Sequence, residues 1–118
     1  MSNARRVVGD AGEDAVASWY IAAGFSVLDR NWRVRGGEID VIARRGTTLV
    51  FCEVKTRRSD RFGTPAEAVT AQKQARIRGV AREWLAAHRV RADVLRFDVA
   101  AVRPNGRGWD VDVIEGAF

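Results

Sequence analysis

The sequence predicts a single α/β domain with a mixed central sheet flanked by helices, and three observations support this. The chain has 118 residues, which is enough for one hydrophobic core and too few for two. Its hydrophobic content of 47% is that of a globular protein. Helical and strand-like patterns follow one another in the order helix, three strands, helix, two strands. The domain is therefore expected to span residues 1–118.

The first half of the chain predicts a helix and an antiparallel three-stranded sheet. Apolar residues recur at three- and four-residue spacing over 5–23, and Gly24 is a suitable helix stop. Strands are expected at 25–34, 38–44 and 47–56. The turn signals Gly36-Gly37 and Arg45-Gly46 separate them, and such short turns connect antiparallel neighbours.

The second half predicts another helix and a hairpin. A capping box, Thr64-Pro65-Ala66-Glu67, begins either a short helix that restarts at Thr70 or one long helix. An apolar stripe at helical spacing runs through 70–90. Two strands are expected near 93–102 and 109–114, separated by the turn Pro104-Asn105-Gly106.

Composition excludes several protein classes. The single cysteine, Cys52, excludes an internal disulfide framework and the usual zinc-finger ligand sets. No apolar run follows the arginines near the N-terminus, so no signal peptide is expected. No stretch approaches the roughly 18 apolar residues of a membrane span. We therefore expect a cytoplasmic protein with no membrane partner.

The net charge of +5 is unevenly distributed along the chain. Residues 1–56 have a net charge of +1, residues 57–91 of +6, and residues 92–118 of −2. A basic middle segment favours a polyanionic partner such as nucleic acid, although a solvated helix face is the alternative.

Acidic residues in the second and third strands predict a chemical site. With a turn at Arg45-Gly46, Asp40 and Glu53 lie nearly opposite one another, and on the same side their carboxylates would be roughly 5 Å apart. Such carboxylates repel unless a cation lies between them, and they are ligands that Mg²⁺ or Mn²⁺ accepts. The opposite strand faces are expected to be wholly apolar, with Ile39, Val41 and Ala43 on one strand and Val50, Cys52 and Val54 on the other.

Lys55 would point into the same site, because it lies two residues beyond Glu53 on the strand. Its amine could orient or deprotonate a water molecule, or hold a phosphate. A solvated Glu–Lys ion pair is the alternative.

These segments resemble a known superfamily. The runs GGEIDVIA at 36–43 and VFCEVKTR at 50–57 are similar to the motif of PD-(D/E)xK nucleases. Nearly the whole chain resembles the bacterial YraN-type family of endonuclease-like proteins, which are related in fold to archaeal Holliday junction resolvases. Gly12-Glu13 and the segment from Phe62 to Gln74 also resemble that family. Ile39 differs from the superfamily signature, which has proline there.

The resemblance implies a restriction-endonuclease-like core and roles for single residues. Asp40 and Glu53 would bind the metal, Lys55 would be catalytic, and Glu13 would be an additional acid reaching the metal or its water. Without the resemblance, Glu13 is an ordinary residue at the edge of a helix stripe. The residues expected to bind nucleic acid are Arg57, Arg58, Arg61, Gln72, Lys73, Gln74 and Arg76, and which of the three from 72 to 74 faces the site stays open.

The function expected from these residues is a metal-dependent endonuclease. It would act on DNA rather than RNA, with branched or structured DNA among the candidate substrates. The alternatives are a nucleic-acid-binding module without turnover and a protein-interaction subunit. A homodimer is also open, because dimers are common in the superfamily.

Overall fold

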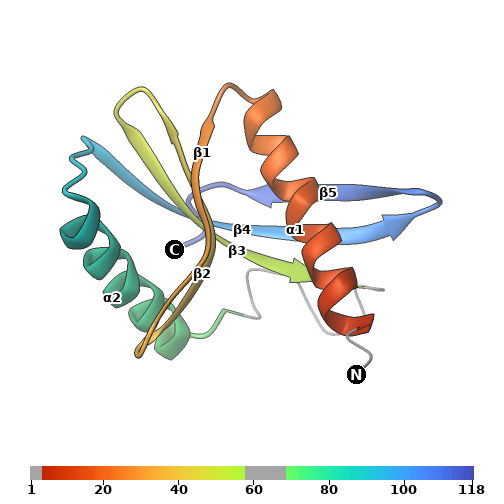
Figure 1. Ribbon diagram of the computed structural model, residues 1–118, viewed down its shortest axis with the longest axis horizontal. Helices are drawn as coiled ribbons and strands as arrows, with labels where there is room; N and C mark the ends of the chain where they lie inside the picture. Colours follow the sequence, from red (N-terminus) through yellow and green to blue (C-terminus); the bar gives the residue numbers. More distant parts are fainter. Residues whose placement is uncertain (1–3, 58–68) are drawn as a thin grey trace.

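The computed structural model describes residues 4–57 and 69–118, with side chains from residue 10 onward. The elements in chain order are α1 (Ala4–Ala22), β1 (Ser26–Val34), β2 (Gly37–Arg45), β3 (Thr48–Thr56), α2 (Ala71–His88), β4 (Val94–Asn105) and β5 (Gly108–Ile114) (Figure 1). This is the predicted order of helices and strands. Arg58, Arg61 and the capping box at 64–67 lie outside the described residues.

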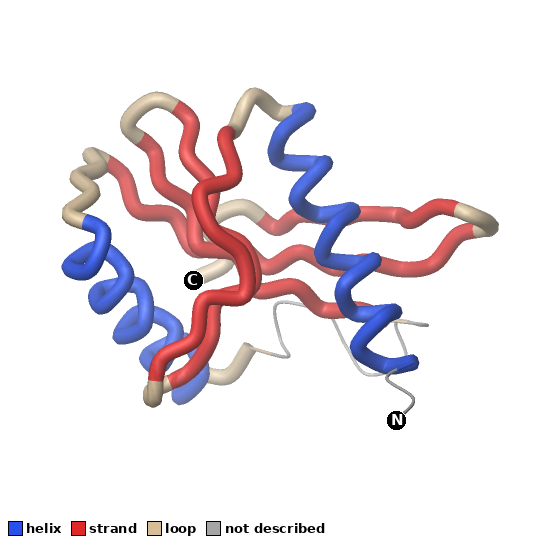
Figure 2. Tube along the Cα trace, viewed as in Figure 1, coloured by secondary structure: helices blue, strands red, loops and turns tan. Residues whose placement is uncertain are grey.

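The five strands form one sheet in the order β1-β2-β3-β4-β5. All neighbouring pairs are antiparallel except β3 and β4, which are parallel. A parallel pair requires a crossover connection, and α2 lies within that connection (Figure 2). The mixed α/β architecture is therefore confirmed, and it is compatible with a restriction-endonuclease-like core.

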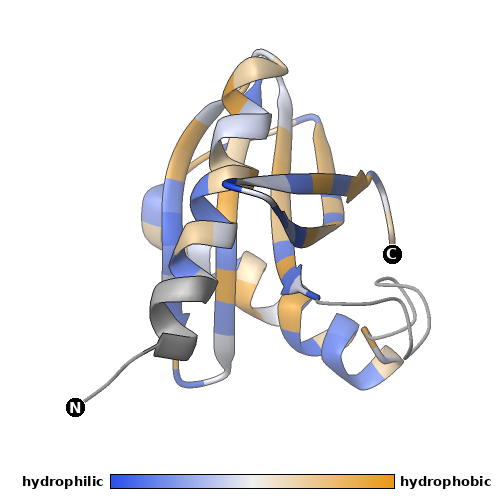
Figure 3. Ribbon diagram, turned by 90° about the vertical axis from the view of Figure 1, so that its right-hand side faces the viewer, coloured by the Kyte–Doolittle hydropathy of each residue, from blue (hydrophilic) through white to orange (hydrophobic). Residues whose placement is uncertain are grey.

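Each face of the sheet has its own hydrophobic core. On one face, α2 packs over a cluster that includes Ile42, Leu49, Phe51 and Trp84. On the other face lies a second cluster that includes Val16 and Tyr20 of α1 together with strand residues such as Val41 and Cys52. The central strands accordingly have continuous buried runs, 41–43 in β2 and 49–52 in β3, and Figure 3 shows hydrophobic stretches within the strands.

The predicted apolar strand face is confirmed except at Ile39, since Val41, Ala43, Val50 and Cys52 share one cluster and Val54 packs against it. The predicted mixed face is also covered, by α2. Ile42, which shares the predicted mixed face with Asp40, is fully buried. Ile39 packs in the α2 cluster with Ile42, whereas Val41 lies in the opposite cluster. Asn31 of β1, which has a φ of 51°, lies between the pairs Arg30–Val41 and Trp32–Ile39, and the register of this ladder shifts between Val27 and Asp29.

Local signals explain where α2 begins and ends. The Thr70 side chain accepts a hydrogen bond from the Lys73 backbone N–H at 3.2 Å, and Arg89 ends the helix in a left-handed conformation. Of the two predicted alternatives, the helix that restarts at Thr70 is therefore correct. The hairpin turn between β4 and β5 is Gly106-Arg107, so Pro104 lies in β4 rather than in the turn.

Two glycines allow close packing around the site. A Cβ atom at Gly12 in α1 would lie 2.9 Å from Val102 Cγ2 and 3.1 Å from Thr56 Oγ1, so α1 crosses the sheet there at close range. Gly37 at the start of β2 meets the side chains of Val80 and Arg76 from α2. Among the helices of the described residues, none combines the length and apolar character that a membrane crossing requires.

Candidate functional site

The predicted pair Asp40 and Glu53 lies where the β2–β3 ladder ends. Val41 pairs with Cys52 in the ladder. One step further, the Val54 backbone N–H donates to Asp40 Oδ2 at 2.8 Å. The Asp40 carboxylate thus takes the place of a backbone acceptor. This hydrogen bond holds the carboxylate against β3, next to Glu53.

Asp40 is in an unfavourable setting for a charged carboxylate. Burial, together with the nearby charge of Glu53, raises the pKa of Asp40 from 3.8 to about 8, although the Val54 N–H opposes the shift. Within the described part of the chain, no ion pair neutralises Asp40. The pair therefore has the electrostatic character expected of a cation site.

Two lysines meet at the carboxylate of Glu53. Lys73 Nζ lies 2.8 Å from Glu53 Oε1, and Lys55 Nζ lies 3.4 Å from the same oxygen. Lys73 comes from the first turn of α2, so the helix supplies a cation to the end of β3. The sequence left open which residue of 72–74 faces the site, and the structure brings Lys73 there. Gln74 donates instead to the Val69 carbonyl, and Gln72 is exposed.

The two lysines differ in their protonation. Burial lowers the pKa of Lys55, and the neighbouring Lys73 contributes in the same direction, although Glu53 opposes both. Burial also disfavours the charged form of Lys73, but its hydrogen bonds to Glu53 and Lys55, together with the charges of Glu53 and Asp40, raise its pKa overall. The site thus combines a lysine that loses its proton more readily with one that keeps it.

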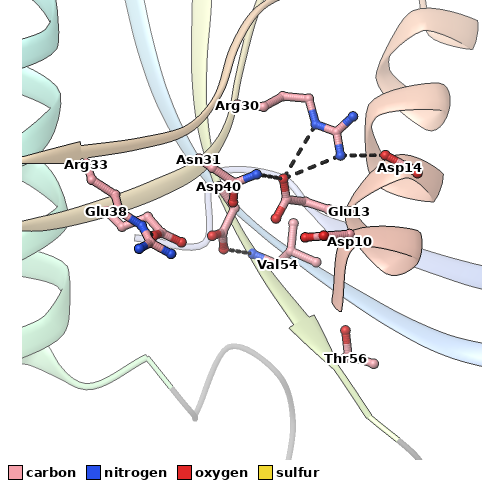
Figure 4. A pocket seen from close by; sticks show the side chains of 10 residues that line it. All are labelled: Asp10, Glu13, Asp14, Arg30, Asn31, Arg33, Glu38, Asp40, Val54 and Thr56. Atoms are coloured by element: carbon pink, nitrogen blue, oxygen red, sulfur yellow. Dashed lines mark hydrogen bonds and ion pairs between the residues drawn. The ribbon is translucent and has the colours of Figure 1, made fainter. Parts of the chain in front are cut away.

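A cavity of about 820 Å³ opens between α1 and the first two strands (Figure 4). Its lining residues are Asp10, Glu13, Asp14, Arg30, Asn31, Arg33, Glu38, Asp40, Val54 and Thr56. Asp40 and Glu38 also line a smaller hollow of about 160 Å³ on the α2 side, together with Glu53, Lys73 and Arg76. Asp40 therefore lies between two hollows that are both rich in carboxylates, and the smaller one has the smaller excess of acids over cations.

Glu13 lies in the larger cavity and is held by β1. Its side chain is nearly buried, and Glu13 Oε1 accepts a hydrogen bond from Asn31 Nδ2 at 2.7 Å. Arg30 approaches the same oxygen at 3.5 Å and pairs with Asp14 at 2.6 Å. Burial raises the pKa of Glu13, against the charge of Arg30 and the Asn31 hydrogen bond.

The donor set fits a small divalent cation in part. Asp40 and Glu53 offer carboxylate oxygens from adjacent strands, and Mg²⁺ is usually held by one or two carboxylates with waters and substrate phosphates completing the shell. Across residues 10–57 and 69–118, no three His, Cys, Asp or Glu side chains converge into a metal cluster. The structure thus places Asp40 beside Glu53 and leaves Glu13 in contact with β1.

Of the remaining predicted residues, one lies beside Glu53 and another lies in a different part of the surface. Arg76 lines the smaller hollow with Glu53. Arg57 continues beyond β3, where its backbone N–H donates to the Val102 carbonyl at 2.8 Å, and it lines a separate hollow beside β4 and β5.

Sequence reasoning missed the contribution of β1 to the cavity. Arg30 and Asn31 contact Glu13, and Arg33 pairs with Glu38. The signal that could have found them is a run of polar residues, Asp29-Arg30-Asn31, in the middle of a strand that pairs with the segment containing Asp40.

Comparison with known proteins now identifies the family. A family model described as "Uncharacterised protein family UPF0102" matches residues 12–102. The chain belongs to the UPF0102 family. This UPF0102 chain is 48% identical over 116 residues to a UPF0102 protein of Frankia casuarinae, with 98% of each chain covered. It is 55% identical over 106 residues to a UPF0102 protein of Kineococcus radiotolerans, covering 89% of this chain and 87% of that relative.

A third relative is a UPF0102 protein of Symbiobacterium thermophilum, 50% identical over 103 residues with 87% of each chain covered. Membership confirms the YraN-type part of the resemblance found in the sequence. The UPF0102 match spans Glu13, Asp40, Glu53, Lys55 and Lys73, so the whole candidate site lies within the family region.

Proposed function

We propose that this UPF0102 chain is a metal-dependent phosphodiesterase of the PD-(D/E)xK type that cleaves nucleic acid, DNA in preference to RNA. The observation that carries the proposal is the carboxylate pair Asp40 and Glu53 on neighbouring strands, with Lys55 at the Glu53 carboxylate. An acid in one strand and Glu-x-Lys in its partner supply the groups that phosphodiester hydrolysis needs.

Asp40 and Glu53 would hold Mg²⁺ or Mn²⁺. The cation would relieve the repulsion that raises the pKa of Asp40, and it would supply charge stabilisation to the phosphate under attack. Glu13 faces the same cavity as Asp40 and would serve as an additional acid close to the site.

The chain's own lysines have separate tasks. The lowered pKa of Lys55 increases the share of neutral amine, which can accept a proton from the attacking water. Lys73 keeps its proton and presents a positive charge beside Glu53, where it can attract a phosphate oxygen. The phosphate backbone of the nucleic acid would therefore lie on the α2 side. The larger cavity beside α1 has five acidic side chains in its lining, and these would repel phosphate.

Cleavage assays test this proposal. Purified protein is incubated with plasmid DNA, branched DNA and RNA, with and without Mg²⁺ or Mn²⁺. We expect metal-dependent cleavage that Lys55→Ala reduces by roughly 100-fold or more, the usual contribution of a general base. Arg107→Ala, in the exposed β4–β5 turn, is the control and should cleave normally.

The other outcomes separate the alternatives. If the folded protein binds nucleic acid without metal but does not cleave it, the result would support a nucleic-acid-binding module. If the folded protein neither binds nor cleaves nucleic acid, the remaining alternative is a protein-interaction subunit. Cleavage that Lys55→Ala does not change would contradict the role of Lys55.

A further inference from the structure

The outer face of α2 carries unpaired positive charge. Residues 71–91 contain six Lys and Arg residues but a single acid, Glu83. The exposed arginines are Arg76, Arg78, Arg82, Arg89 and Arg91. None of them forms an ion pair with another described residue. Figure 2 shows α2 at the edge of the molecule, where this face is open to a partner.

Three of these arginines, here called the arginine stripe, lie on one flank of the helix and directly after its end: Arg78, Arg82 and Arg89. Arg78 and Arg82 are four residues apart and share a flank of α2, and Arg89 follows the helix in a left-handed conformation. The stripe is about 16 Å long at 1.5 Å per residue. The Arg78 guanidinium lies over the rings of Phe97 and Phe118 at 5.5 and 5.3 Å, which places this flank beside β4.

The arginine stripe is separate from the candidate site. Lys73 and Arg76 lie on the other flank, where Lys73 contacts Glu53 and the Arg76 stem lies beside Gly37 in β2. The buried residues of α2, Ile77, Val80, Ala81 and Trp84, separate the two flanks on the side facing the sheet. The chemistry proposed for Lys55 and Lys73 therefore does not explain the stripe.

The pattern differs from that of an ordinary solvated helix. Like charges at i and i+4, such as Arg78 and Arg82, destabilise a helix by roughly 0.2–0.5 kcal/mol. No acid on the stripe compensates for this. On the far edge of the sheet, β5 instead exposes Asp110 and Asp112. The charge distribution therefore favours a polyanion at α2 over the β4–β5 hairpin, where two acids balance two arginines.

We propose that the arginine stripe binds the phosphate backbone of duplex nucleic acid. The proposal rests on the proposed function, because it takes nucleic acid as the partner, and it adds where a duplex arm outside the cleavage site is held. The length of the stripe along the backbone, about 16 Å, matches roughly five base pairs of a duplex at 3.4 Å per step. Guanidinium groups bind phosphate oxygens through paired hydrogen bonds.

Binding measured without divalent metal tests the arginine stripe. A labelled 20-base-pair duplex is titrated in EDTA at several salt concentrations between 50 and 200 mM, with fluorescence anisotropy as the readout. We expect Arg82→Gln and Arg89→Gln each to reduce the slope of log affinity against log salt by about 1, and the double variant by about 2. The double variant should bind on the order of tenfold more weakly at 0.1 M salt.

Arg107→Gln is the matched control, because it removes one exposed arginine at the opposite edge of the sheet and should leave the slope unchanged. An unchanged slope in the Arg82/Arg89 double variant, with thermal unfolding unchanged, would overturn the proposal. The proposal would also be overturned if polyglutamate displaced the protein from the labelled duplex as effectively as unlabelled duplex does. That result would indicate an acidic protein partner.

The result is distinguishable from a failure of the proposed cleavage. If the wild-type protein never cleaves but the double variant loses salt-dependent binding, the arginine stripe stands and the nuclease proposal fails. If duplex DNA is cleaved with unchanged affinity in the double variant, the nuclease stands and the stripe fails. At saturating DNA, the cleavage rate constant of the double variant should equal that of wild type, because neither arginine contacts the site.

Discussion

Two strand carboxylates, Asp98 in β4 and Asp40 in β2, differ in the hydrogen-bond donors that surround them. Asp98 is fully buried and accepts four hydrogen bonds. They come from the Tyr20 hydroxyl at 2.6 Å, two Arg96 nitrogens at 2.9 and 3.0 Å, and the Gly116 backbone at 3.0 Å. Asp40 has one backbone donor and a second carboxylate beside it.

The difference separates a structural acid, Asp98, from the acid proposed to bind a metal, Asp40. A buried carboxylate with a full set of donors joins elements together, and Asp98 joins α1, β4 and the segment after β5. Burial, with the nearby Cys52 and Asp98, raises the pKa of Tyr20, so its hydroxyl remains a donor. Asp40 lacks such partners, which is the condition expected where an external cation completes the set.

The largest expected effect comes from removing the structural acid. Asp98→Ala leaves the Tyr20 hydroxyl and the Arg96 guanidinium without their acceptor in a buried region. We expect a loss of about 3–5 kcal/mol in the free energy of unfolding, measured by urea denaturation. Asp112→Ala removes an exposed strand acid and should change stability by less than about 0.5 kcal/mol. Equal effects of the two variants would remove the distinction drawn for Asp98.

Asp40→Asn should separate stability from activity. Because the folded state raises the pKa of Asp40 from 3.8 to about 8, folded protein binds a proton more tightly than unfolded protein. Wild-type stability is therefore expected to fall as pH rises between about 4 and 8, and this component is absent from the variant. At pH 8 without divalent metal, Asp40→Asn should be more stable than wild type by at least about 1 kcal/mol.

The same variant should lose metal-dependent cleavage, since it removes a proposed metal ligand. Urea denaturation of both proteins at pH 4, 6 and 8 measures the stability difference, and a plasmid assay measures cleavage. Parallel pH profiles for the two proteins would show that the charged form of Asp40 does not destabilise the folded state.

Glu13→Gln should have the smallest effect on stability. Glutamine keeps an oxygen that accepts from Asn31 Nδ2, and the Arg30 contact it weakens is long at 3.5 Å. We expect a change of less than about 1 kcal/mol in the free energy of unfolding. If Glu13 assists the metal, the Mg²⁺ concentration needed for half-maximal cleavage should rise severalfold. A loss as large as that of Asp98→Ala would place Glu13 with the structural acids instead.

Much of this architecture could be predicted from the sequence, because it depends on local patterns. Helical and strand periodicity, the turn glycines and the Thr70 cap predict the order and approximate bounds of every described element. The nearly opposite positions of Asp40 and Glu53 follow from a short turn between two antiparallel strands, since a two-residue hairpin sets the register.

Other features depend on contacts between distant parts of the chain. Lys73 could not be chosen over its neighbours until α2 was placed against the end of β3, and Tyr20 could not be linked with Asp98 across 78 positions. Periodicity likewise cannot show that Ile39 and Ile42 pack in the same cluster, because residues three apart in a regular strand point to opposite faces.

The sequence by itself determined the elements, their order and the acid–Glu-x-Lys pattern, since each of these arises from residues close together in the chain. Only the tertiary structure decided how those groups are neutralised: Glu53 meets Lys55 and Lys73, Glu13 meets Arg30 and Asn31, and Asp40 forms no ion pair with another described residue. Electrostatic energies depend on distance and burial across the fold, and neither can be read from residue order.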